Sequence, residues 1–222
     1  LGEQRHQVAQ LLSVAPLVAQ ESRGRLQVHF DSASLSHIVG RAIEQVQVQL
    51  STQKRRTRIE ITTNAAFRTL PDIVCDSALM TQVFVNLINN AVKYSLPPGK
   101  GEPALIRVLA EPQATMAGFL VENWGLGIPA DEYEEIFQPF VRGGLEDTQK
   151  AIRGMGLGLF LSRRIMRAHR GDLFCRDSSP TLKDPRRLAL MEGYKTIFEL
   201  RLPYNLTPGT HTVALDISGS VR

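Results

Sequence analysis

The chain has 222 residues, of which 43% are hydrophobic and 22% are charged. These fractions are typical of globular proteins and exclude collagen-like or wholly disordered chains. No apolar run approaches the roughly 18 residues of a membrane-spanning helix. The net charge is only +4, and the basic residues are not clustered as they are in a nucleic-acid-binding protein. Two cysteines, Cys75 and Cys175, are too few for a disulfide framework or a four-ligand zinc site, so we interpret them as buried thiols of a soluble, intracellular α/β protein.

Apolar periodicity predicts the following elements in chain order. Residues 1–20 have helical spacing, 26–30 alternate as a strand, and a helix begins at Ser34 or Ser36 and reaches Leu50. Strands are expected at 58–63 and 73–75, a long helix at 77–94, and strands at 104–110 and 117–122. Residues 123–156 are glycine-rich, with one or two helical turns near 133–137. A helix at 157–169 ends at Gly171 as a left-handed cap residue, and strands at 172–177 and 196–202 close the domain. This order predicts a two-layer α/β sandwich.

The helix expected at 77–94 carries a polar seam. Apolar residues cover nearly its whole circumference, so it must be largely buried. Asn86, Asn90 and Lys93 nevertheless fall within about 60° of one another. A single buried asparagine is more often a core hydrogen-bonding residue, but three aligned polar groups including a lysine favour a bound anion or metal. Neutral amide oxygens suit magnesium where phosphates supply the negative charge.

Two glycine segments provide the second signal. Asn123-Trp124-Gly125-Leu126-Gly127-Ile128-Pro129 follows a strand, and Gly154-Met155-Gly156-Leu157-Gly158-Leu159 opens a helix. Glycines before a helix allow backbone N–H groups to surround phosphates. Either segment alone could be a flexible turn. The dinucleotide fingerprint and the lysine-containing phosphate loop are both absent.

In their order and spacing these motifs, with Ile136-Phe137-Gln138-Pro139-Phe140 between them, closely resemble the catalytic ATP-binding domain of sensor histidine kinases, a branch of the GHKL superfamily. The resemblance covers about residues 26–203, and Val85–Ser95 is similar to the family's asparagine box at almost every position. It implies a Bergerat-type GHKL fold, with a mixed sheet and helices on one face, that binds ATP and Mg²⁺.

The resemblance also implies individual roles. Asn90 would hold Mg²⁺, Asn86 would support the phosphates, Lys93 would meet their charge, and Tyr94 would pack on the adenine or ribose. Phe137, Phe140 and Arg142 would begin a mobile lid over residues 142–153. The remaining cofactor-binding positions follow from the glycine segments, namely Asn123, Gly125, Gly127 and Ile128 around the base and Gly154, Gly156, Leu157 and Gly158 at the phosphates.

Asn86 indicates which branch of the superfamily is involved. Relatives that hydrolyse ATP or phosphorylate hydroxyls place a glutamate there as general base, and an amide cannot take a proton. A neutral imidazole already offers a lone pair, so Asn86 favours transfer to histidine and disfavours a serine-kinase or anti-sigma-type relative. The acceptor motif is missing, because His6 lacks its sequence context. We therefore expect a protein-histidine kinase that is inactive as an isolated fragment.

The expected organisation has three parts. Residues 1–24 end a dimerisation or linker helix, 25–204 form the catalytic domain, and 205–222 are a C-terminal extension. The chain begins at Leu1, so we expect a longer homodimeric protein, cytoplasmic or the cytoplasmic part of a membrane-bound sensor. Its partners would be its own phosphoacceptor helices and a response regulator. The alternative is a nucleotide-binding pseudokinase or docking module with altered base preference, because Asn123 replaces the family's aspartate.

Overall fold

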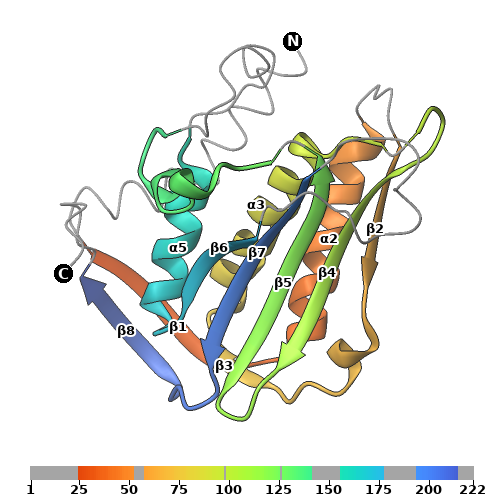
Figure 1. Ribbon diagram of the computed structural model, residues 1–222. Helices are drawn as coiled ribbons and strands as arrows, with labels where there is room; N and C mark the ends of the chain where they lie inside the picture. Colours follow the sequence, from red (N-terminus) through yellow and green to blue (C-terminus); the bar gives the residue numbers. More distant parts are fainter. Residues whose placement is uncertain are drawn as a thin grey trace.

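A computed structural model describes residues 25–52, 58–97, 99–125, 127–141, 156–177 and 194–214 (Figure 1). Its helices are α2 (Leu35–Ser51), α3 (Ser77–Tyr94) and α5 (Gly158–Ala168), with short 3-10 turns η1 (Ala65–Arg68), η2 (Ala130–Glu132) and η3 (Glu135–Phe137). Its strands are β1 (Arg25–Ala33), β2 (Ile59–Thr63), β3 (Ile73–Cys75), β4 (Ala104–Pro112), β5 (Met116–Gly125), β6 (Asp172–Asp177), β7 (Tyr194–Pro203) and β8 (Gly209–Ala214).

The strands form two sheets. The larger sheet has the order β2-β4-β5-β7-β6, in which only the β2–β4 pair is parallel. The smaller sheet has the order β3-β1-β8. The three helices lie together on one face of the larger sheet (Figure 1). The predicted two-layer α/β sandwich with a mixed sheet is therefore confirmed.

The core lies between α3 and the larger sheet. Along β4 every second residue from Ala104 to Ala110 is buried, as expected for a strand with one face against helices. In the centre of this layer, Phe84 of α3 meets Phe119 of β5 edge to face, with ring centroids 5.6 Å apart. The helix predicted at 77–94 is confirmed, and all of its apolar residues from Met80 to Val92 are buried.

The outer face of β5 is held by a charged cluster. The Glu122 carboxylate forms salt bridges with Arg107 at 2.7 Å and with Lys195 at 2.8 Å. The Arg107 guanidinium also lies 4.7 Å from the centroid of the Trp124 ring. Because side chains alternate along a strand, Glu122 and Trp124 on this face place Asn123 on the opposite, helix-facing side.

The beginning of α3 is tied to the end of α5. The Asp76 side chain caps α3 by accepting the N–H groups of Ala78 and Leu79. His169 accepts the Asp76 N–H through Nε2 at 3.0 Å and donates from Nδ1 to the Ile165 carbonyl oxygen at 2.7 Å. Burial lowers the pKa of His169, so the neutral ring is the form that makes both bonds.

One predicted cap is wrong. Arg170, and not Gly171, has the left-handed conformation after α5, with φ of 56°. The Gly171 N–H donates to the Met166 carbonyl and the Arg170 N–H to the Arg167 carbonyl, which is the Schellman arrangement with Arg170 at its left-handed position. Gly171 is needed for another reason, because a Cβ there would collide with the Arg201 carbonyl oxygen.

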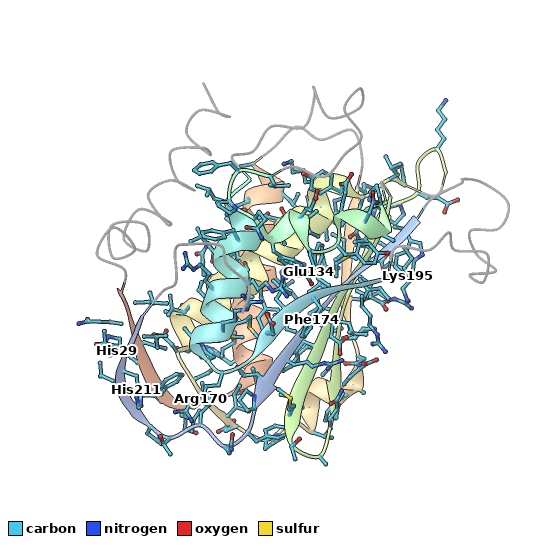
Figure 2. All side chains as sticks on the ribbon, turned by 60° about the vertical axis from the view of Figure 1, so that its left-hand side comes forward. His29, Glu134, Arg170, Phe174, Lys195 and His211 are labelled. Carbon is cyan, nitrogen blue, oxygen red and sulfur yellow. The ribbon has the colours of Figure 1, made fainter. Side chains whose placement is uncertain are left out.

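The segment predicted as a C-terminal extension contains β8, which pairs antiparallel with β1. His211 of β8 packs edge-on against Phe30 of β1, at a centroid distance of 5.1 Å. His29 lies on the same small sheet, and Figure 2 shows both histidines apart from Glu134, Phe174 and Lys195.

The predicted helix of residues 1–20 lies outside the described residues. Cys75 is buried as predicted, whereas Cys175 is only half-buried.

Candidate functional site

The predicted polar seam is a half-exposed line on an otherwise buried helix. Asn86, Asn90, Lys93 and Tyr94 are all partly accessible, whereas Leu87, Ile88, Ala91 and Val92 between them are buried. The Lys93 ammonium lies 4.9 Å from the centroid of the Tyr94 ring. The seam extends about 12 Å along the helix axis from Asn86 to Tyr94. It is therefore a polar surface that the fold leaves open.

The first residue of the seam touches the beginning of α5. The Asn86 amide donates to the Ser162 hydroxyl at 2.9 Å, and Ser162 is buried. A Cβ at Gly158, the first residue of α5, would lie 2.9 Å from Asn86 Cγ. Gly158 therefore lets the two helices approach closely enough for Asn86 to reach the N-terminus of α5.

That N-terminus has the features of an anion site. The cap residue Leu157 makes no side-chain capping bond, so the first N–H groups of α5 have no cap among the described residues. Gly156 has φ of 69°, which favours glycine, and its carbonyl accepts the Phe140 N–H at 3.0 Å. Phe140 is itself left-handed, with φ of 66°, and 72% exposed.

Two predicted residues of this end, Arg142 and Gly154, lie outside the described residues, as does the predicted lid of residues 142–153.

The other end of the seam is closed by a second glycine contact. A Cβ at Gly125 would overlap the Tyr94 carbonyl oxygen and lie 2.9 Å from Ser95 Cα. The Leu96 N–H donates to the Trp124 carbonyl at 2.9 Å. The end of β5 is thereby fastened to the end of α3, and the half-buried Gly127 and Ile128 follow directly.

Asn123 lies on this fastened end of β5. It is 2% exposed, and its amide nitrogen has no hydrogen-bond partner among the described residues. Thr196 stands directly opposite on β7, is 3% exposed, and its hydroxyl is likewise without a partner in that part of the chain. Sequence reasoning missed Thr196, because only the β5–β7 register places it beside Asn123.

Arg163 fixes the turn that precedes Phe140. Its guanidinium bonds Glu134 at 2.6 Å and Asp172 at 3.0 Å and lies 4.6 Å from the centroid of the Phe137 ring. Figure 2 shows Glu134 close to Phe174, whose ring centroid is 5.9 Å from the same guanidinium. Burial acts to lower the pKa of Arg163, but the hydrogen bonds to both carboxylates outweigh it and raise the pKa. Arg163 and Ser162 were not predicted from sequence, since their partners are distant along the chain.

In the described part of the chain, the polar seam leads from an uncapped helix start to two buried groups without a partner, and this arrangement is typical of a nucleotide-binding α/β domain. Residues 75–206, more than half of the chain, match the family of histidine kinase-, DNA gyrase B- and HSP90-like ATPases. The chain belongs to this family of ATP-binding domains.

Named relatives agree with this assignment. The chain is 32% identical over 178 residues to the adaptive-response sensory kinase SasA of Thermosynechococcus vestitus, covering 80% of this chain and 43% of SasA. It is 30% identical over 180 residues to the cell-division control histidine kinase PdhS of Brucella ovis, covering 78% of this chain and 16% of PdhS. The chain therefore spans less than half the length of these curated relatives.

Solved structures share the fold. The mycobacterial sensor histidine kinase MprB superposes with a TM-score of 0.56 at 20% identity, covering 78% of this chain and 97% of the chain in that structure. The catalytic domain of the histidine kinase ThkA gives 0.54 at 23% identity, covering 79% of this chain and 95% of ThkA.

The donor set suits magnesium better than a transition metal. The described residues contain no group of three or more His, Cys, Asp or Glu side chains that could hold a metal ion. The seam instead offers the neutral amide of Asn90, and amide oxygens fit a hard cation whose remaining ligands are phosphate and water.

None of the described helices is both long enough and apolar enough to cross a bilayer.

Proposed function

We propose that this chain binds Mg²⁺ and ATP along the seam of α3 and transfers the γ-phosphoryl group to a histidine outside the chain. The observation that carries the proposal is the half-exposed line Asn86–Asn90–Lys93–Tyr94 on a buried helix, with the uncapped start of α5 beside Asn86. Asn86 and the amides of Gly156, Leu157 and Gly158 would face the phosphates, and Tyr94 and Asn123 the nucleoside.

Asn90 would hold the magnesium ion, which supplies neutralisation of phosphate charge when bound. Lys93 lies one turn further on the same seam and would add a positive charge. Phosphoryl transfer depends mostly on positioning and charge neutralisation, so these fixed groups on a rigid helix suit it.

Asn86 supports histidine as the acceptor. Its amide donates to Ser162 and has no basic nitrogen, so it cannot take a proton from water or a hydroxyl. An imidazole nitrogen attacks phosphorus with its own lone pair, the bond from phosphorus to the β–γ bridging oxygen breaks, and ADP leaves with those electrons. The acceptor would lie on dimerisation helices of the same homodimeric, cytoplasmic-side protein, and a response regulator would receive the phosphoryl group.

A second candidate function is a pseudokinase that binds nucleotide and acts as a docking module. It is favoured by Asn123, which replaces the charged acceptor expected at this position with a weaker neutral one. The two candidates differ in whether bound ATP is turned over in the presence of the acceptor helix.

Incubating the full-length protein with γ-labelled ATP separates these functions. We expect label on a histidine, in a linkage that acid cleaves and alkali preserves, and no label in the Asn90→Ala variant. Nucleotide binding without label would favour the pseudokinase. Steady release of phosphate by the isolated chain would instead indicate a hydrolysing relative.

A further inference from the structure

Two buried polar side chains face the helix layer at the end of the α3 seam. The Asn123 amide nitrogen and the Thr196 hydroxyl are fully buried, and neither has a hydrogen-bond partner in the described part of the chain. They are direct neighbours in the β5–β7 register. Buried polar atoms in folded proteins are nearly always paired, so two adjacent exceptions point to a ligand that supplies the missing partners.

The described neighbours of these two groups offer them no hydrogen-bond partner. The neighbour of Asn123 on its other side is Ile106 of β4, which is fully buried and apolar. The strand end that carries Asn123 is fastened to the end of α3 by the Leu96–Trp124 backbone bond. Asn123 and Thr196 are therefore held in place by backbone contacts, and the Asn123 amide nitrogen and the Thr196 hydroxyl have no hydrogen-bond partner among the described residues.

Their position on the seam identifies which part of a nucleotide they would meet. Asn86 touches the uncapped start of α5, where phosphates would bind, and Tyr94 lies about 12 Å further along the helix axis. Gly125 packs on Tyr94, and Asn123 is two residues before it. A nucleotide with its phosphates at α5 thus presents its base to Asn123 and Thr196, an argument that rests on the proposed function.

Both groups can donate or accept a hydrogen bond. A side-chain amide offers a carbonyl oxygen on one side and an NH₂ group on the other, and a hydroxyl rotates to either role. Turning the Asn123 amide over breaks no hydrogen bond of its nitrogen, because that nitrogen has no partner among the described residues. A carboxylate at the same position could only accept, and it would repel a carbonyl oxygen of the base.

We propose that Asn123, together with Thr196, relaxes the choice of base, so that this chain binds 6-oxopurine nucleotides as well as 6-aminopurine nucleotides. The Asn123 carbonyl accepts the amino group of adenine, and its NH₂ group, after the amide turns over, donates to the O6 atom of a 6-oxopurine. Asn123 is thus a residue that determines specificity for the base.

Calorimetric titration of the 222-residue chain with ATP and with ITP, in magnesium buffer, tests the proposal. ITP differs from ATP in the oxo group at the 6-position and in the hydrogen on N1, so the ratio of the two Kd values reports the contacts at this edge of the base. We expect the wild-type Kd values to agree within about tenfold. In Asn123→Asp the ratio should move at least about 25-fold towards ATP, from a roughly fivefold gain for ATP with a charged acceptor and a similar loss for ITP.

Gln113→Glu is the matched control, because it adds the same charge at the exposed turn between β4 and β5 and should leave the ratio unchanged. If Asn123→Asp does not fold, Thr196→Val decides, since loss of its hydroxyl should weaken both nucleotides by roughly three- to tenfold. Unchanged binding of both nucleotides by Thr196→Val overturns the proposal.

The remaining outcomes separate the two proposals. A wild-type chain that binds ATP but discriminates against ITP by more than about tenfold overturns the relaxed base choice and leaves the proposed function standing. The same conclusion follows if Asn123→Asp binds both nucleotides as the wild type does. A wild-type chain that binds neither nucleotide contradicts the proposed function and this inference together.

Discussion

Replacing Gly125 by alanine should loosen the junction between β5 and α3. The added Cβ would overlap the Tyr94 carbonyl oxygen and come within 3.0 Å of the Leu96 nitrogen, both of which are backbone atoms with little freedom to move. Such overpacking costs about 1–3 kcal/mol, and losing the Leu96–Trp124 hydrogen bond costs about 0.5–1.5 kcal/mol. Removing a glycine from the unfolded chain returns roughly 0.5–1 kcal/mol. We therefore expect a net loss of about 0.5–4 kcal/mol in the free energy of unfolding, with about 2 kcal/mol as the central value.

Urea unfolding measures this loss. With a loss of about 2 kcal/mol and a slope of about 2 kcal/mol per molar urea, the midpoint should fall by about 1 M. The matched control is Gly40→Ala on the exposed side of α2, where no atom lies within 4 Å of the added Cβ. That change should raise stability by about 0.5–1 kcal/mol. Equal midpoints for Gly125→Ala and the wild type would refute the close contact.

Three further predictions concern the supports of the site. Burial lowers the pKa of His169, so the unfolded chain binds more protons below about pH 6.5, and stability should fall with decreasing pH by at most about 1.4 kcal/mol per unit. When unfolding by urea is measured between pH 7.5 and 5.5, the free energy of unfolding should depend less on pH in His169→Gln than in the wild type; an equal pH dependence in both proteins would contradict this. Asn90→Ala should weaken ATP binding in magnesium about tenfold or more and shift stability by less than about 0.5 kcal/mol, whereas calorimetry of Asn89→Ala should show near-normal affinity. Arg163→Lys should lose about 1–3 kcal/mol in urea unfolding, because an ammonium cannot reproduce the planar fork that joins η3 to β6; unchanged stability would show that this fork contributes little.

Local pattern was sufficient for most of the described helices and strands, and it predicted that three polar residues of α3 lie on one line of the helix surface. The helix of α3 follows from its apolar circumference, and the alignment of Asn86, Asn90 and Lys93 follows from 3.6 residues per turn. The glycine segments predicted Gly125 at the base and Gly158 at the phosphates; in the structure Gly125 packs against the backbone of Tyr94, and Gly158 packs against the side chain of Asn86. Each of these predictions depends on residues that are close together along the chain, within a single helix or strand.

Contacts between distant segments could not be read in this way. Thr196 becomes part of the site only through the register of β7 against β5, and Ser162 only through the packing of α5 on Asn86. The end of α5 shows the same limit, because glycine usually takes the left-handed position but Gly171 is required for contact with Arg201. Sheet register and helix packing are tertiary properties, and a single sequence carries only their apolar pattern.

A crystal structure of this chain with Mg²⁺ and a non-hydrolysable ATP analogue tests the central claim most directly. The account predicts the metal at Asn90, the phosphates between Asn86 and the start of α5, and the base within hydrogen-bond distance of Asn123 and Thr196. A nucleotide bound away from the α3 seam, or one with its base at α5 and its phosphates at Asn123, would contradict it.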